Sequence, residues 1–156
     1  MKNLPTKIGC DRFSDTRGSL VKLFTTDNND LPLNFQICDQ YISTSKKFVF
    51  RGLHMQPNTS KLIKVVRGSI IDVSFKLGDG GLSPDRIHEI PLKACEDSIL
   101  FIPSNYYHGF LAMEDETQII CMSNLPHDPK HEKVFSIKNI NVSFKEIPMI
   151  TSQKDS

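Results

Sequence analysis

The feature that most constrains the fold is a succession of short strand-type runs, because no segment of the chain carries a long apolar repeat of about 3.6 residues. The runs contain alternating apolar or β-branched residues, and Gly, Pro, Asn or Asp separates one run from the next. They lie at residues 20–26, 35–43, 47–54, 61–66, 70–77, 86–92, 98–102, 109–113, 117–122, 134–137 and 141–144. About ten short strands at roughly regular spacing predict a sandwich or barrel with little helix. At 156 residues the simplest form is a single all-β jelly-roll domain over residues 1–156.

Three local features add detail to this expectation. The runs at 61–66 and 70–77 flank a tight turn that contains Gly68, which predicts a β-hairpin. Residues 1–14 look irregular, and the polar residues 27–30 predict a break in the chain. The regular part of the fold is therefore expected to begin after residue 14.

The composition excludes several classes of function. The chain has 19 basic and 18 acidic residues, a net charge of +1 and no basic stripe, so we expect neither a nucleic-acid nor an anionic-membrane partner. The N-terminus has no apolar signal-peptide core, and no apolar run reaches the length of a membrane span. The 4 cysteines form no C-x-x-C pair, which argues against a zinc ribbon. These observations predict a cytoplasmic protein with reduced thiols.

The candidate site starts from the segment RGLHMQ (51–56), which closes one strand, and Lys61, which opens the next. A histidine can transfer protons near neutral pH, an arginine fork suits phosphate, and a lysine can stabilise a developing negative charge. In a regular strand Arg51 and His54 would point to opposite faces, whereas a bulge at Gly52 would bring both to one face. The alternative is that these side chains are ordinary solvated residues at strand ends.

The histidines do not form a recognisable metal motif. Metal-binding jelly rolls of the cupin type commonly carry His-x-His, a nearby Glu and a later His. Here Gln56 follows His54 at the second position, and no Glu lies between residues 51 and 88. We therefore expect no metal, and His108 is equally compatible with a hydrogen-bonded structural histidine.

Four blocks of the sequence carry a resemblance to a known family. They are DTRGSL (15–20), RGLHMQ (51–56), KLIKVVRGSIIDVSF (61–75) and FIPSNYYHGFL (101–111), and a weaker match reaches the C-terminus. In content and order they resemble the dTDP-4-dehydrorhamnose 3,5-epimerase family. The resemblance implies a cupin-like jelly roll, or double-stranded β-helix, that forms a homodimer. It also implies a cofactor-independent enzyme of deoxysugar and polysaccharide biosynthesis, whose substrate is a nucleotide-linked, dTDP-type 4-keto-6-deoxy sugar.

The resemblance assigns roles to individual residues. His54 would be the base that removes the proton next to the ketone, and Lys61 would stabilise the enolate oxygen. An arginine near the N-terminus, Arg17, would help to hold the diphosphate, reaching into the site of the partner subunit. The residues that the resemblance assigns to substrate binding are Arg17, Arg51, Gln56 and His108.

An acid must orient the imidazole of the base and stabilise its charged form. The family has this acid in a C-terminal Ser-x-Lys-Asp stretch, which residues 152–155 match, so Asp155 is the candidate. Two alternatives remain open at this point. The tail could be disordered, as chain ends usually are, or Asp72 within a strand could be the partner of His54.

The sequence also departs from the family. The family carries a tyrosine shortly after the position of Cys121 as the acid on the opposite face, and residues 121–126 contain none. Its Gln-x-Asn pair, which helps to line the nucleotide pocket, is replaced by residues 39–41, Asp-Gln-Tyr. An epimerase of one centre, a 3,4-ketoisomerase and a catalytically silent binding barrel therefore stay open as alternatives. The ketoisomerases tend to carry His-x-His, which Gln56 does not match.

Overall fold

The computed structural model describes residues 3–26, 31, 35–78 and 80–155, so the break expected at 27–30 lies outside the described residues. The regular structure consists of strands and one short 3-10 turn, which confirms the all-β expectation with little helix. The elements are β1 Thr6–Gly9, β2 Asp11–Asp15, β3 Gly18–Lys22, β4 Asp39–Ser45, β5 Phe50–Met55, β6 Lys61–Arg67, β7 Ser69–Phe75, β8 His88–Lys93, β9 Ser98–Ile102, β10 Tyr107–Ala112, β11 Thr117–Ser123, β12 Lys133–Val134 and the turn η1 Ile137–Asn139. Among these residues no helix is long and apolar enough to cross a membrane.

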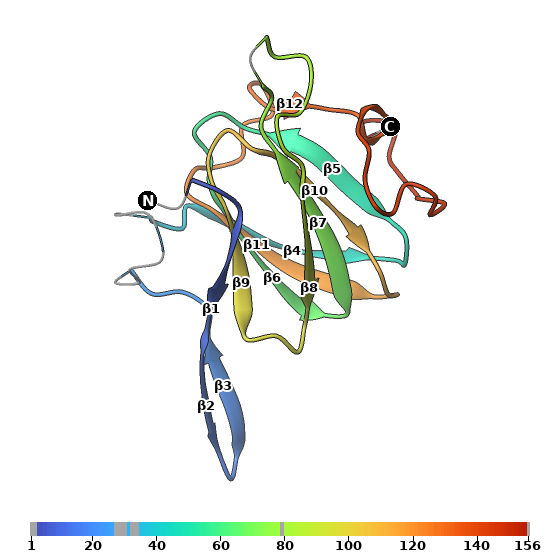
Figure 1. Cartoon of the computed structure of the whole chain (residues 1–156). Helices are drawn as coiled ribbons and strands as arrows, with labels where there is room; N and C mark the ends of the chain where they lie inside the picture. Colours follow the sequence, from blue (N-terminus) through green and yellow to red (C-terminus); the bar gives the residue numbers. More distant parts are fainter. Residues whose placement is uncertain (1–2, 27–30, 32–34, 79, 156) are drawn as a thin grey trace.

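Ten of the strands form two antiparallel five-stranded sheets, in the orders β1-β9-β6-β11-β4 and β12-β5-β10-β7-β8. The sheets stack face to face (Figure 1), and from β4 to β12 consecutive strands alternate between them, except that β7 and β8 are neighbours in the second sheet. An apolar cluster that draws on β6 to β11 fills the space between the sheets, including Ile63, Val65, Leu100, Phe110 and Ile119. This is the expected jelly roll.

The hairpin expected between residues 61–66 and 70–77 is wrong. β6 pairs with β9 and β11 in one sheet, whereas β7 pairs with β8 and β10 in the other. Gly68 carries the chain from one sheet to the other at φ 73°, and a Cβ there would lie 2.5 Å from the Oγ1 of Thr117. Two strands joined by such a short corner have the local sequence pattern of a hairpin. They lie in different sheets because each pairs with strands that are distant in the chain.

The expectations for the two ends of the chain also need correction. Residues 1–14 are not irregular throughout, because β1 pairs with β9 and β2 pairs with β3. Residues 141–144 form no strand. Val142 and Phe144 instead bury their side chains against the outer face of the second sheet. In both cases a distant partner, rather than the local pattern, decides the conformation.

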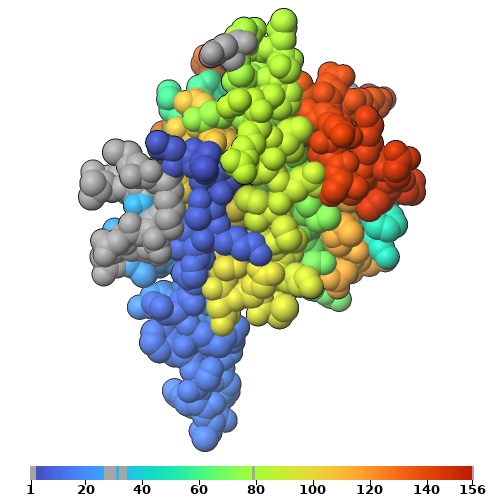
Figure 2. All heavy atoms as spheres, viewed as in Figure 1, coloured from blue at the N-terminus to red at the C-terminus, as the bar shows by residue number. Residues whose placement is uncertain are grey.

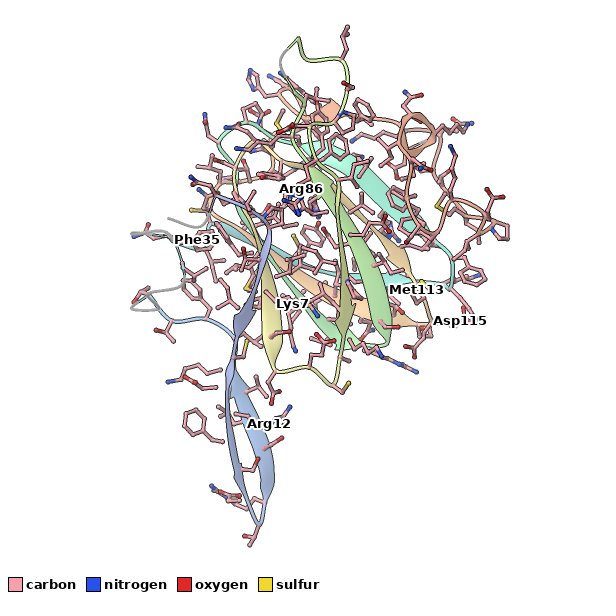
Figure 3. The ribbon with its side chains drawn as sticks, viewed as in Figure 1. Lys7, Arg12, Phe35, Arg86, Met113 and Asp115 are labelled. Carbon is pink, nitrogen blue, oxygen red and sulfur yellow. The ribbon has the colours of Figure 1, made fainter. Side chains whose placement is uncertain are left out.

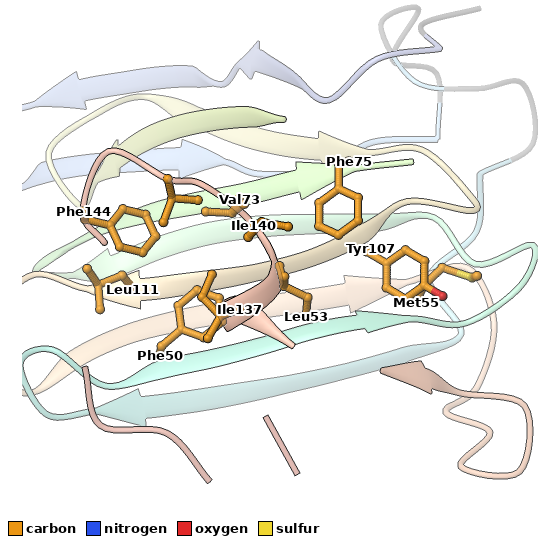
Figure 4. Packing of buried hydrophobic residues seen from close by; sticks show 11 residues of the cluster. Phe50, Leu53, Met55, Val73, Phe75, Tyr107, Leu111, Ile137, Ile140 and Phe144 are labelled. Carbon is orange, nitrogen blue, oxygen red and sulfur yellow. The ribbon is translucent and has the colours of Figure 1, made fainter. Parts of the chain in front are cut away.

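The C-terminal segment covers that outer face before it returns to the end of the barrel. Figure 4 shows Ile137, Ile140 and Phe144 over the side chains of β5, β7 and β10. Burying each large apolar side chain contributes roughly 1.5–3 kcal/mol. The segment then pairs with the start of β5, where the amide of Phe50 donates to the carbonyl of Ile150 at 2.9 Å. This path directs the last residues of the tail toward the mouth of the barrel.

The hairpin of β2 and β3 projects away from the barrel (Figures 1 and 2). Arg12, labelled in Figure 3, fastens it to the barrel by donating from Nε and Nη2 to the two carboxylate oxygens of Asp97, at 2.7 and 2.6 Å. Phe13 and Leu20 face each other across the two strands and are 56% and 60% exposed. The hairpin therefore presents an apolar pair that the described part of the chain leaves largely exposed.

Candidate active site

A cavity of about 560 Å³ lies between the two sheets at one end of the barrel. This volume is within the range of small-molecule sites. Alternate residues of β4, together with side chains of β6 and β11, line one wall, and side chains of β5 and β10 line the other, as the two-residue period of a strand requires. Its polar and titratable lining residues include Asp39, Tyr41, Ser43, Arg51, His54, Gln56, Lys61, His108, Cys121, Ser123, His127, Glu132, Lys154 and Asp155.

A bulge in β5 brings Arg51 and His54 to the same wall, which is one of the two arrangements that the sequence left open. His54 pairs with His108 and Arg51 pairs with Phe110, so β5 uses one more residue than β10 over the same distance. Gly52 makes this possible, because it has φ 116° and a Cβ there would lie 2.5 Å from the Cα of Gly109. A side chain larger than hydrogen does not fit at this position.

The structure brings Asp155, not Asp72, to His54. The Nε2 atom of His54 lies 2.7 Å from the Oδ1 atom of Asp155, which is only 7% exposed. Asp72 instead accepts from Nδ1 of His108 at 3.1 Å and from the hydroxyl of Ser74. The C-terminal tail therefore folds over the site, and His54 and His108 contact different aspartates.

His108 is held as a neutral hydrogen-bonding group. Burial lowers the pKa of His108, and the positive charge of Lys61 lowers it further, although Asp72 opposes both effects. A neutral imidazole that donates from Nδ1 to Asp72 keeps Nε2 as an acceptor. His108 can therefore accept a hydrogen bond from a bound molecule, but it is not placed to carry a charge at neutral pH.

Glu132 is a site residue that the sequence analysis missed. Its Oε1 atom lies 3.2 Å from Nδ1 of His54, and its other oxygen forms an ion pair with Lys154. Burial works to raise the pKa of Glu132, but the hydrogen bond from Lys154 and the charge of His54 together lower it. The only local hint is that Glu132 directly precedes β12, a strand that pairs with the end of β5.

Two of the predicted binding residues also make contacts within the chain. The guanidinium of Arg51 donates from Nε to the hydroxyl of Ser45 at 2.9 Å, so it extends toward β4 across the cavity. Gln56 donates to the carbonyl of Pro126 at 2.9 Å and accepts from the amide of Asp128 at 2.8 Å. Its side chain therefore fixes the loop after β11 beside the cavity.

Six of the seven predicted site residues thus meet in one cavity, and Arg17 lies outside it. Arg17 sits at the turn of the projecting hairpin, where its side chain is 88% exposed and forms an ion pair with Asp15 at 2.6 Å.

A metal was not expected from the sequence. Within the described part of the chain, no group of three or more His, Cys, Asp or Glu residues could hold one.

Comparison with known proteins identifies the family. The family model for dTDP-4-dehydrorhamnose 3,5-epimerase matches residues 6–156. The chain belongs to the dTDP-4-dehydrorhamnose 3,5-epimerase family. A curated relative of that name from Mycolicibacterium smegmatis is 24% identical over 149 residues, which cover 92% of this chain and 74% of the relative. The resemblance seen in the sequence is confirmed.

Solved structures of related epimerases share the fold. The dTDP-4-dehydrorhamnose 3,5-epimerase from Sulfolobus tokodaii matches with a TM-score of 0.81 at 29% identity, covering 96% of this chain and 85% of that one. The dTDP-6-deoxy-D-glucose-3,5-epimerase from Legionella pneumophila, solved in complex with dTDP-4-keto-L-rhamnose, matches with a TM-score of 0.83 at 21% identity. That match covers 96% of this chain and 83% of the Legionella chain.

One expected departure concerns residues 121–126, where the resemblance implies a tyrosine as the opposite-face acid. Residues 121–126 contain no tyrosine, and the buried thiol of Cys121 lines the cavity there. Tyr106 and Tyr107 do not replace it, because they are 7% and 6% exposed and pack in the apolar clusters. The hydroxyl of Tyr106 donates to the carbonyl of Asn3 at 3.1 Å, outside the cavity.

Proposed function

We propose that this chain epimerises a dTDP-linked 4-keto-6-deoxy sugar by proton abstraction next to the ketone. The observation that carries the proposal is the contact between His54 and Asp155, which sets a proton-transfer pair inside a cavity of about 560 Å³. Family membership and the keto-sugar bound by the Legionella relative give the substrate class. A barrel that only binds its ligand has no need of a tail carboxylate fixed to a histidine.

His54 acts as the general base. The Asp155 carboxylate orients the imidazole and stabilises the imidazolium that forms when the ring takes a proton from the substrate carbon. The proton goes to the ring nitrogen that Asp155 does not hold, so the bound sugar displaces the longer contact to Glu132. Loss of the proton leaves an enolate, and reprotonation from the other face inverts the carbon.

Lys61 and His108 stabilise the reacting oxygens. The ammonium of Lys61 on β6 lies across the cavity from β5 and stabilises the enolate oxygen. His108 offers an acceptor to a sugar hydroxyl through Nε2. The reaction moves protons without net oxidation or reduction, so the side chains of the cavity can perform it without a redox cofactor.

The nucleotide end of the substrate lies toward Arg51 and Gln56. The guanidinium of Arg51 has the fork that binds phosphate oxygens, and it extends across the cavity toward β4. Gln56 holds the loop at residues 126–128, which borders the cavity, so its side-chain amide lies at the same edge of the cavity.

The chain works as a homodimer in this proposal. A two-stranded hairpin is only marginally stable alone, and the β2–β3 hairpin carries the exposed apolar pair Phe13 and Leu20. Packing this hairpin against a second copy would bury that pair and bring Arg17 to the phosphates of the neighbouring site. The four free cysteines suit a reducing compartment, so a cytoplasmic location is part of the proposal.

Solvent exchange tests the proposed chemistry. The protein is incubated in D2O with a dTDP-linked 4-keto-6-deoxy sugar, and proton NMR follows the signals of the carbons next to the ketone. We expect deuterium to enter at one or both carbons, and His54→Asn to slow this exchange by ~10²–10⁴-fold, as for loss of a general base. Binding of dTDP, measured by calorimetry, serves as the control for folding. Exchange at an unchanged rate in His54→Asn would exclude His54 as the base.

A further inference from the structure

Inversion of a carbon needs a second proton carrier, because a base that returns its own proton restores the starting configuration. The acid must stand on the wall of the cavity opposite His54. That wall is formed by β4, β11 and β6, whereas His54 and its partner Asp155 belong to the side of β5. The proposed function therefore requires a proton donor from the first sheet.

Few side chains on that wall can donate a proton. Among the described residues of that wall, those with a dissociable proton are Tyr41, Cys121 and Lys61, while the hydroxyls of Ser43 and Ser123 are far weaker acids and the carboxylate of Asp39 accepts a hydrogen bond from the amide of His127. Lys61 is already assigned to the enolate oxygen. Cys121 is 1% exposed, so its thiol lies largely behind the surface of the cavity that it lines.

Two other possible donors lie outside the strands of the first sheet. Lys154 forms an ion pair with Glu132, which itself contacts His54, so a proton from Lys154 would reach the substrate from the side of the base. His127 belongs to the loop after β11, where its amide donates to Asp39 at 3.3 Å and its charge helps to lower the pKa of Glu132.

Tyr41 has the position that the reaction needs. It lies on β4 between Asp39 and Ser43, and these three alternate residues all face the cavity. It pairs directly with Cys121 of β11, and its hydroxyl interacts with the Cys121 thiol. The phenol thus lies beside Cys121, shortly before the position to which the resemblance assigns the family's acid, but it comes from the neighbouring strand.

We infer that Tyr41 is the acid that protonates the enolate on the face opposite His54, an inference that rests on the proposed epimerase function. The O–H bond of Tyr41 breaks as the new C–H bond forms, which leaves a phenolate and a neutral ketone. Solvent then returns a proton to the phenolate, and the imidazolium of His54 releases the abstracted proton to solvent. The sugar gains and loses one proton, so the reaction balances without a further reactant.

The surroundings of Tyr41 suit this role. Burial of the hydroxyl and the neighbouring Cys121 thiol raise the pKa of Tyr41, so the phenol stays protonated at neutral pH. An enolate is itself a strong base and can take a proton from a phenol. Tyr41 is 53% exposed because β4 is the edge strand of its sheet, which leaves a route by which water can reprotonate it.

The test separates exchange from inversion. In D2O with a dTDP-linked 4-keto-6-deoxy sugar, Tyr41→Phe should still let His54 exchange the proton next to the ketone, with deuterium entering at nearly the normal rate and with retention of configuration. Formation of the inverted sugar should fall by ~10²–10⁴-fold at an unchanged KM, as expected for loss of a general acid. Tyr106→Phe is the matched control, because that hydroxyl lies outside the cavity, and it should leave both rates unchanged.

Three results would overturn the assignment. If Tyr41→Phe lowers exchange and inversion equally and raises KM, Tyr41 is a binding residue. If both rates are unchanged, another group is the acid. If the unaltered protein binds the sugar but exchanges no proton, the proposed epimerase function fails and Tyr41 has no acid role. That last result is seen without any substitution, so the two failures are distinguishable.

Discussion

Replacing Gly52 by alanine should damage the fold at the bulge that aligns Arg51 with His54. The added Cβ would lie 2.5 Å from the Cα of Gly109 and 2.7 Å from the carbonyl oxygen of His108, and both neighbours are backbone atoms that cannot rotate away. Forcing extra volume into a packed site costs about 1–3 kcal/mol, and a non-glycine residue at φ 116° adds about 1–3 kcal/mol of strain. The free energy of unfolding should therefore fall by ~2–6 kcal/mol.

Urea denaturation followed by circular dichroism measures this change, and two other glycines provide controls. Gly18 has φ 131°, but no atom lies within 4 Å of the Cβ that alanine would add. The free energy of unfolding of Gly18→Ala should therefore fall only by the cost of backbone strain. Gly9→Ala has neither the positive φ nor a close neighbour and should be close to neutral. If Gly52→Ala is no less stable than Gly18→Ala, the close approach of β5 and β10 is not what requires glycine.

Three further outcomes are expected. Burial and Lys61 lower the pKa of His108 below the 6.5 of an unfolded histidine, so between these two pKa values the unfolded chain binds more protons than the folded chain. The contribution of His108 to the free energy of unfolding should therefore be constant above about pH 7 and be lost as the pH falls from there through the pKa of the folded state. His108→Gln should show a less steep loss of stability in acid. Lys61→Met should slow exchange of the substrate proton by ~10²–10³-fold while dTDP binding, measured by calorimetry, persists. Light scattering should give a dimer, and Arg17→Ala should raise KM without dissociating it; a monomer at working concentration would remove the role given to Arg17.

The sequence predicted those parts of the site that depend on local pattern. Strand alternation and the glycine between Arg51 and His54 pointed to a possible bulge, and the strand at residues 98–102 has the same bounds in the structure. The position of Lys61 at the start of β6 follows from the same alternation. These features are encoded within a few residues of each other.

The sequence did not predict features that depend on distant pairing. β1 exists because it pairs with β9, and β6 and β7 separate because each finds its partners elsewhere in the chain. The choice between Asp72 and Asp155 depended on the path of the C-terminal segment, which apolar packing on the outer face of the second sheet decides. Glu132 reaches His54 only because β12 pairs with β5, and no local sequence motif predicts this pairing.

The proposed mechanism depends most on Asp155, whose carboxylate makes His54 a working base. Asp155→Asn keeps the shape of the side chain and the fold of the tail but removes the carboxylate that lies 2.7 Å from Nε2 of His54. The decisive measurement is the rate at which this variant exchanges the proton next to the ketone of a dTDP-linked 4-keto-6-deoxy sugar in D2O, relative to the unaltered protein. We expect a loss of ~10²–10⁴-fold, since the same substitution in a Ser-His-Asp triad costs about 10⁴-fold. Exchange at the normal rate would contradict it.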